Sequence, residues 1–294
     1  MNTVFVTADG REVDLATLGP DDLQTLADDQ EFAYAARIRA SAKGSPERQE
    51  AITRGYDLVC AALMRLGHES MGFNPRFARL AQDLLAPVIA RDGSASFFEV
   101  GFGAGAMLKA IRSPQVRVAG IEASPHLVAC AREQLGDGQA DLHQGLLVQH
   151  TIAERFDVVY WNDVAEHLHP DEIGDYLGAI HALLKPGGRL ITVTPNWHTR
   201  PWDATRRTKG VRHQAEGFHL KEYTLREMHA LLGAVGFTCI TVPLIVTRRR
   251  IWLARRGLIG LKRLCEPLLE FLPYTLAWRG CTAAGMHCTV ATRP

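Results

Sequence analysis

The chain has 294 residues, of which 47% are hydrophobic and 22% charged, a globular composition that excludes global disorder. Lysine and arginine number 33 against 32 aspartate and glutamate residues, so no bulk electrostatic attraction to nucleic acid is expected. The charge is uneven, however: residues 243–294 contain nine basic and two acidic side chains, a local net charge of +7, which leaves −6 for the rest.

No segment has the character of a targeting or membrane-spanning element. The first residues lack a basic region followed by an apolar run, and no stretch approaches the roughly 18 apolar residues needed to cross a bilayer. The six cysteines form no Cys-x-x-Cys pair and no cluster with histidine at zinc-binding spacing. We therefore expect a cytoplasmic protein with reduced thiols.

Residues 1–92 predict a mainly helical region. In chain order it contains a hairpin signal at Asp9-Gly10 between 3–7 and 11–15, then helical periodicity over 23–38, 52–66 and 75–90. Pro87 is expected to kink or end the third helix. We expect this region to form a lid over a pocket or a dimerisation surface.

From residue 93 onward, short apolar strands alternate with helical segments. Strands are expected at 96–101, 116–122, 156–161, 189–194, 237–242 and 286–292, and helices near 104–112, 125–135, 171–184 and 224–235. This alternation is typical of βαβ units, and the near-continuous apolar strands indicate a sheet buried on both faces. Residues 93–294 are therefore expected to form one α/β domain of Rossmann-like architecture, interrupted before its last strand by a basic helical insert at 243–285.

The segment from Phe97 to Ala106 places a glycine-rich turn between a strand and a helix. Glycine allows a positive φ and close approach of a ligand, and the helix N-terminus offers free N–H groups. Gly101, Gly103 and Ala106 fit the G-x-G-x-x-A fingerprint. The turn therefore predicts a site for a nucleotide-containing cofactor.

Two carboxylates help to choose between cofactors. Glu122 ends the second strand, where it can bind both ribose hydroxyls of either NAD or an S-adenosyl ligand. Glu99, two residues before the first glycine, would repel a pyrophosphate but suits the ammonium group of S-adenosylmethionine. An NAD-dependent oxidoreductase remains the alternative, although Glu99 and the absence of a Tyr-x-x-x-Lys pair argue against it.

Four segments, in the right order and spacing, resemble class I S-adenosylmethionine-dependent methyltransferases. They are the glycine turn with Glu122, FDVVYWNDVAEHL at 156–168, LLKPGGRLITVTPN at 183–196 and GFHLKEYTLREMHALLGAVGF at 217–237. The last resembles the branch that contains quinone-biosynthesis and glycan- or natural-product-modifying enzymes. The resemblance covers roughly residues 94–242 and implies a seven-stranded, mostly parallel sheet with S-adenosylmethionine as the cofactor.

The resemblance also implies roles for individual residues. Those implied in cofactor binding are Glu99, Gly101, Phe102, Gly103 and Gly105 for the methionine part, Glu122 for the ribose, Ala123 and Ser124 beside the adenosine, and Trp161 and Asn162 at the cofactor edge. The family often has Gly-Asp at the adenine, whereas here Gly145 is followed by Leu146. The adenine would then be held by backbone groups and apolar packing around Leu146.

Methylation of a hydroxyl usually needs a base, and two histidines are candidates. His167 lies just past the expected cofactor edge, and His219 lies in a segment expected to follow the active-site face. The alternative for each of these two residues is a structural histidine that is held by hydrogen bonds and takes no part in catalysis. His167 and His169 near Asp163 are residue types that bind metal ions. No second carboxylate pair supports a metal site, however, so no metal is expected.

The function favoured by these observations is O-methylation of a small-molecule acceptor, which would be a small metabolite, a natural product or a sugar. A non-catalytic cofactor-binding module remains a further alternative, because an intact cofactor motif does not prove turnover.

Two further segments leave alternatives open. The loop 197–216 carries two tryptophans and five basic residues and is either an acceptor contact or a solvated loop. Within the insert, residues 248–272 place Ile251, Leu258, Leu261, Cys265, Leu268 and Leu272 on one helical stripe. This basic amphipathic helix either packs on its own domain or in a homodimer, or contacts an anionic membrane or a lipid-linked substrate.

Overall fold

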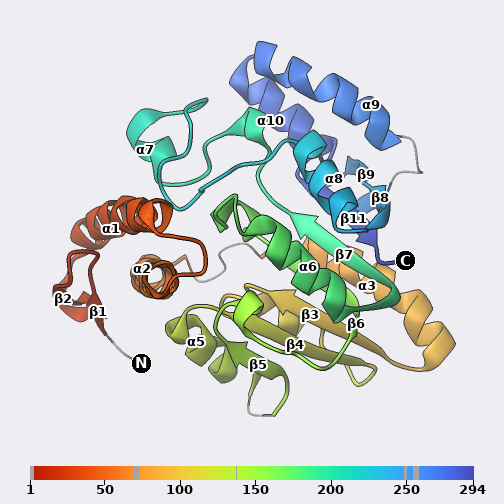
Figure 1. The fold of residues 1–294 in the computed structure, drawn as a ribbon, viewed down its shortest axis with the longest axis horizontal. Coiled ribbons are helices and arrows are strands. Elements are labelled where there is room, and N and C mark those ends of the chain that lie inside the picture. Colours follow the sequence, from red (N-terminus) through yellow and green to blue (C-terminus); the bar gives the residue numbers. More distant parts are fainter. Residues whose placement is uncertain (1–2, 69–72, 137, 248–249, 254–257) are drawn as a thin grey trace.

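The computed structural model describes residues 3–68, 73–136, 138–247, 250–253 and 258–294. Its centre is a seven-stranded sheet (Figure 1) made of β3 (Ala95–Val100), β4 (Val116–Glu122), β5 (Asp141–Gln144), β6 (Phe156–Asn162), β7 (Leu184–Val193), β8 (Thr238–Thr241) and β11 (Cys288–Thr292). The strand order is β5-β4-β3-β6-β7-β11-β8. The first five are parallel, and β11 runs antiparallel to β7 and β8. The predicted Rossmann-like, mostly parallel sheet is confirmed.

Helices cover both faces of this sheet. They are α3 (Pro75–Asp92), α4 (Ala106–Ile111) and α5 (Pro125–Leu135) on one face, and α6 (Ile173–Leu183) and α8 (Leu225–Ala234) on the other. Because side chains alternate along a strand, Phe97 enters the first core and Phe98 the second. This double burial explains why the central strands are almost entirely apolar.

The three N-terminal helices begin at proline. They are α1 (Pro20–Ala40), α2 (Pro46–Arg65) and α3, and the side chains of Ser45 and Asn74 cap the last two by accepting hydrogen bonds from backbone N–H groups. Proline suits the first helical position because its missing N–H would have no partner there. Helix α3 continues past Pro87 to Asp92, so of the two predicted alternatives, a kink or an end at Pro87, the end is wrong. The buried residues Phe77, Leu80 and Leu85 hold the helix against the sheet.

The N-terminal region has a core of its own. Helices α1 and α2 pack together with the predicted hairpin, β1 (Val4–Val6) and β2 (Glu12–Asp14). This core also takes in Leu146, which follows β5, and Phe218, which belongs to the long segment after β7. The region therefore packs beside the carboxyl ends of the parallel strands, on the left of Figure 1.

The insert differs from its expected form. Its first part is an antiparallel hairpin of β9 (Pro243–Val246) and β10 (Ile251–Leu253), so Ile251 lies in a strand and not on a helical stripe. Helical structure follows in α9 (Leu258–Cys265), a 3-10 segment (Glu266–Phe271) and α10 (Tyr274–Ala283). The expected single stripe over 248–272 is therefore wrong in its first part, and residues 248–249 and 254–257 lie outside the described residues. Among the described helices, none combines the length and apolar character that crossing a membrane requires.

Candidate functional site

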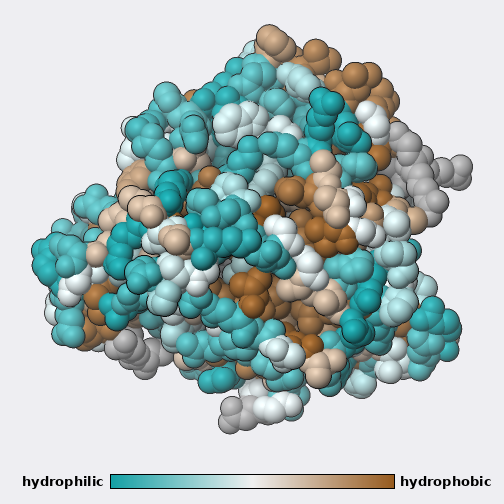
Figure 2. All heavy atoms as spheres, viewed as in Figure 1, coloured by the Kyte–Doolittle hydropathy of each residue, from teal (hydrophilic) through white to brown (hydrophobic). Residues whose placement is uncertain are grey.

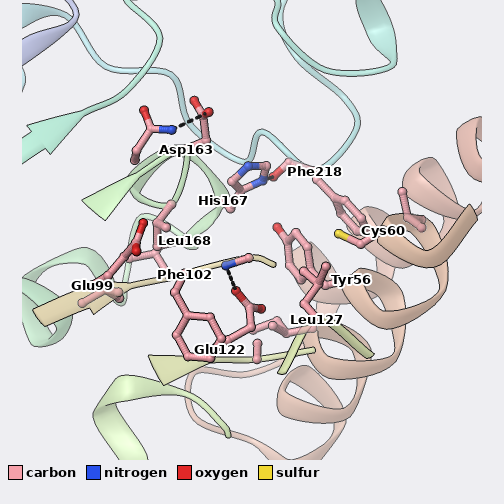
Figure 3. A pocket seen from close by; sticks show the side chains of 18 of the residues that line it. Tyr56, Cys60, Glu99, Phe102, Glu122, Leu127, Asp163, His167, Leu168 and Phe218 are labelled. Atoms are coloured by element: carbon pink, nitrogen blue, oxygen red, sulfur yellow. Dashed lines mark hydrogen bonds between the residues drawn. The ribbon is translucent and has the colours of Figure 1, made fainter. Parts of the chain in front are cut away.

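A cavity of about 400 Å³ lies where β3, β4 and β6 end. This volume is within the range of small-molecule sites. Of the residues implied in cofactor binding, it is lined by Glu99, Gly101, Phe102, Gly103, Glu122, Ala123, Leu146 and Asn162. Both candidate bases, His167 and His219, also line it. Gly105, Ser124 and Trp161 are not among the lining residues. Figure 3 shows how side chains from the strand ends and from α2 meet in this cavity.

The glycine turn leaves its backbone open to the cavity. Gly101 and Gly103 have φ values of 71° and 54°, which favour glycine. A Cβ on Gly101 would lie 2.5 Å from Cγ2 of Val164, whereas the corresponding space beside Gly103 is open. The turn thus packs against Val164 on one side and exposes the Gly103 backbone to a ligand on the other.

Glu122 is fixed at the end of β4 by two backbone hydrogen bonds. Its carboxylate oxygens accept from the N–H groups of Gly103 and Ser124, each at 3.0 Å. Burial raises the pKa of Glu122, while these hydrogen bonds counteract the rise. Each oxygen keeps a second lone pair, so the carboxylate is available, in a fixed orientation, for two hydroxyl donors.

Ser124 has a structural task beside this carboxylate. Its hydroxyl accepts from the N–H of Leu127 as the N-cap of α5 and donates to Asp57 of α2 at 2.7 Å. Ser124 therefore supports the cavity wall and ties it to the N-terminal region.

Glu99 is buried at the opposite side of the glycine turn. Its Oε2 atom has no hydrogen-bond partner within the described part of the chain. Burial, followed by the charge of Glu122, raises the pKa of Glu99 well above its usual range. A buried carboxyl oxygen without a partner is costly, and a cationic donor would satisfy it. The site thus fits a ligand that carries an ammonium group.

The adenosine end of the expected site is apolar. Phe102, Leu127 and Leu146 line the cavity, and Figure 3 shows Phe102 and Leu127 beside Glu122. Trp161 lies in the core under α6 and α8, where its indole N–H donates to Thr192 Oγ1 at 2.7 Å, and Tyr160 lines the cavity instead. Tyr160 faces the cavity in place of Trp161 because neighbouring residues of a strand point to opposite faces of the sheet.

His167 is held as a neutral imidazole. Its Nδ1 lies 3.1 Å from the carbonyl oxygen of Phe218, and because a carbonyl only accepts, Nδ1 carries the proton and Nε2 keeps the lone pair. Burial, followed by the positive charge of His219, lowers the pKa of His167 well below its usual range. His167 is therefore neutral at neutral pH, with an unprotonated Nε2.

His219 has the opposite charge state. Its Nδ1–H donates to Glu222 Oε1 at 2.6 Å. Burial lowers the pKa of His219, but the bond to Glu222 and the charges of Glu166 and Glu222 outweigh it and raise the pKa to about 9. His219 is therefore a cation at neutral pH and is not free to act as a base.

The site also contains residues that the sequence did not single out. Tyr56 and Cys60 of α2 line the cavity, and the Tyr56 ring stacks on Phe218 with centroids 4.4 Å apart. The Tyr56 hydroxyl is buried and has no partner among the described residues. Only the proposal of an N-terminal lid pointed to these helices, and no local motif identified the side chains.

Glu166 is buried behind the two histidines. It accepts from Thr194 Oγ1 at 2.9 Å, and burial together with the charge of Asp163 raises its pKa to about 8. Donor atoms of Glu166, His167 and His219 lie within 4.8 Å of one another, a spacing that a metal ion could bridge. The charge on His219 disfavours a cation at this point, and the absence of a metal remains a prediction.

The loop after β7 is partly built into the cavity wall. Trp202, Asp203 and Arg207 line the cavity, and Arg207 pairs with Asp28 of α1. Elsewhere in the loop, Arg200 pairs with Glu270 of the insert at 2.9 Å. The loop is therefore tied to the rest of the chain at both of these points.

Comparison with known proteins identifies the domain that carries this site. A model of the family described as "Methyltransferase domain" matches residues 73–242, which is more than half of the chain. The ubiquinone biosynthesis O-methyltransferase of Bradyrhizobium sp. (strain ORS 278) is 30% identical over 103 residues, 34% of this chain and 40% of that protein. The chain thus matches less than half the length of this curated relative.

Solved structures of low sequence identity share the fold. The S-adenosylmethionine-bound amino pentose methyltransferase CalS10 of Micromonospora echinaspora has a TM-score of 0.51 at 21% identity, covering 79% of this chain and 97% of that one. The CurJ carbon methyltransferase has a TM-score of 0.52 at 13% identity, covering 97% of this chain and 72% of that one. These likenesses support the architecture described above.

Proposed function

Since this chain belongs to the methyltransferase domain family, as its resemblance to class I enzymes predicted, we propose that it transfers a methyl group from S-adenosylmethionine to an oxygen atom of a small molecule. The observation that carries this proposal is the pair of buried carboxylates on either side of the glycine turn. Glu122 is oriented for a ribose, and Glu99 has an oxygen that lacks a partner among the residues that the structure describes. The family match excludes the dehydrogenase alternative, for which Glu99 would be unfavourable.

The chain's own residues orient the reactants and handle the proton. Bound S-adenosylmethionine supplies a methyl group on a sulfonium, a good leaving group, so the protein mainly has to align the acceptor and exclude water. The lone pair on His167 Nε2 receives the proton of the acceptor hydroxyl. Burial, together with the charged His219 beside it, keeps the pKa of His167 low, so the Nε2 lone pair is unprotonated at neutral pH.

The N-terminal region forms the acceptor side of the site in this proposal. Tyr56 and Cys60 bring α2 to the cavity wall, and Tyr56 stacks on Phe218, whose carbonyl orients His167. The Tyr56 hydroxyl, which has no partner in the described part of the chain, is available to an acceptor hydroxyl. A cavity of this size suits a small metabolite, a natural product or a sugar, and oxygen as the acceptor atom agrees with the activity named for the Bradyrhizobium relative.

Binding of two ligands tests the cofactor assignment. By isothermal titration calorimetry, S-adenosylhomocysteine is expected to bind in the micromolar range, about −8 kcal/mol, because both carboxylates find donors on it. NAD is expected not to bind, because its pyrophosphate would face Glu99. Binding of NAD in preference to S-adenosylhomocysteine would contradict the proposal. Binding of S-adenosylhomocysteine without turnover on any hydroxyl-bearing acceptor would instead indicate a non-catalytic module.

A further inference from the structure

The segment 215–219 carries His219 and the Phe218 carbonyl that binds His167, and it belongs to no helix or strand. It follows α7 (Thr205–Lys209) in the long loop after β7, and Figure 2 shows mainly hydrophilic side chains over α7. Phe218 and His219 are nevertheless buried. Because buried backbone groups outside helices and strands need partners elsewhere, those partners decide how the segment lies.

The N–H groups of this segment are held by a threonine and by helix α1. The buried hydroxyl oxygen of Thr205 accepts from the N–H groups of Glu216 and Gly217, at 2.8 and 3.3 Å. The N–H of Phe218 donates to Glu31 Oε1 of α1 at 3.2 Å. Helix α1 therefore reaches the backbone at the residue whose carbonyl meets His167.

The carbonyl groups are held by Arg39, which follows Glu31 on α1 by about two turns. The Arg39 guanidinium donates to the backbone carbonyls, at 3.4, 2.6, 3.0 and 3.2 Å, of Ala215, Glu216, Gly217 and His219. A guanidinium presents its N–H donors in a fixed planar fork, which lets one side chain bind several carbonyls. Within 215–219, all of which the structure describes, the Phe218 carbonyl alone bonds to His167 and not to Arg39.

We infer that Arg39 is a positioning residue for the base of the proposed reaction. By binding the carbonyls of Gly217 and His219, Arg39 leaves the Phe218 carbonyl between them directed toward His167 Nδ1. An acceptor at Nδ1 keeps the proton there and the lone pair on Nε2, whereas without it either nitrogen can carry the proton. Arg39 thus selects the tautomer that the proposed reaction uses.

The inference rests on the proposed function, because Arg39 acts through His167. Arg39 itself is not among the described residues that line the cavity. Its replacement should therefore change the state of His167 and leave the cofactor contacts of Glu99 and Glu122 in place.

Nitrogen-15 NMR of the imidazole groups in the full chain tests the inference directly. The signals of His167 are assigned by their loss in His167→Ala, and in the wild type they should show a protonated Nδ1 and an unprotonated Nε2. Arg39→Lys keeps the charge, but one ammonium group cannot bind carbonyls spread along the segment. Both nitrogens of His167 should then show the averaged shifts of mixed tautomers.

The matched control is Arg37→Lys. Arg37 is also half-buried on α1, and its guanidinium donates to the Ala8 carbonyl at 3.1 Å, a contact within the N-terminal region. This variant loses a bond of the same kind and should keep the wild-type tautomer of His167. Unfolding temperatures from circular dichroism establish that each variant is folded.

Kinetics of the same proteins give a second readout. Arg39→Lys is expected to lower kcat on a hydroxyl-bearing acceptor by about 10- to 100-fold, the effect of a misplaced catalytic group. Its affinity for S-adenosylhomocysteine, measured by isothermal titration calorimetry, should equal that of the wild type.

An unchanged His167 tautomer in Arg39→Lys, or the same mixture of tautomers in Arg37→Lys, would overturn the inference, as would a wild-type kcat in Arg39→Lys. Failure of the wild type to methylate any hydroxyl-bearing acceptor would count against the proposed function instead. The NMR comparison does not depend on turnover, so it would still decide whether Arg39 orients His167.

Discussion

Replacement of Glu122 by alanine is expected to weaken the binding of S-adenosylhomocysteine by about 100-fold or more. A carboxylate that accepts two ribose hydroxyls contributes roughly 1.5–3 kcal/mol for each charge-assisted hydrogen bond. The variant also leaves the N–H groups of Gly103 and Ser124 without their acceptor, so the glycine turn loses a constraint. Isothermal titration calorimetry measures the change directly.

The matched control is Glu133→Ala, which removes an exposed carboxylate from α5 outside the cavity lining. Its affinity for S-adenosylhomocysteine should equal that of the wild type, which separates the specific contact from a general loss of negative charge. If Glu122→Ala binds as tightly as the control, the ribose assignment is refuted.

The variant His167→Ala is expected to lower kcat by about 10²- to 10⁴-fold, the usual contribution of a positioned general base. Affinity for S-adenosylhomocysteine should change little, because the ring lies on the acceptor side. The pH profile carries a second signature: since the pKa of His167 lies well below 6.5, the wild-type rate should not fall as an ordinary histidine becomes protonated near pH 6.5.

Turnover is measured as S-adenosylhomocysteine formation with a panel of phenols, sugars and other hydroxyl-bearing acceptors. His169→Ala provides the control, because His169 is a neighbouring histidine that pairs with Asp171 and does not line the cavity. A His167→Ala enzyme with wild-type turnover would show that the residue is structural.

The central strands were predictable because each one is buried on both faces and reads as an apolar run. β5 was not predicted individually, since Asp141–Gln144 is a short, partly exposed edge strand with no apolar pattern. β10 was assigned to a helix because the mixture of apolar and basic residues over 248–272 fits a helical period, and its pairing with β9 is a tertiary effect. Local sequence cannot decide such cases.

The cofactor side of the site was predictable for a related reason. Glu99, the glycine turn and Glu122 belong to one βαβ unit, so their spacing in the sequence fixes their arrangement in space. The acceptor side joins Tyr56 to His167 and Phe218, which are far apart in the sequence. Only tertiary packing brings them together, and the charge difference between His167 and His219 depends on partners such as Glu222 that are visible only in the fold.

Recognition of S-adenosylmethionine depends on Glu99 as the partner of a cationic amino group. Because burial, followed by the charge of Glu122, raises the pKa of Glu99, its carboxyl keeps a proton in the free protein up to a higher pH than usual and must release it when an ammonium binds. Affinity for S-adenosylhomocysteine should therefore increase with pH until Glu99 is ionised in the free protein.

Calorimetry of S-adenosylhomocysteine binding in two buffers of different ionisation enthalpy measures this proton most directly. The wild type should release a proton on binding, and Glu99→Gln should bind more weakly and lose that release. Identical affinity and proton release in the two proteins would contradict the assignment, and with it the reason for choosing this cofactor.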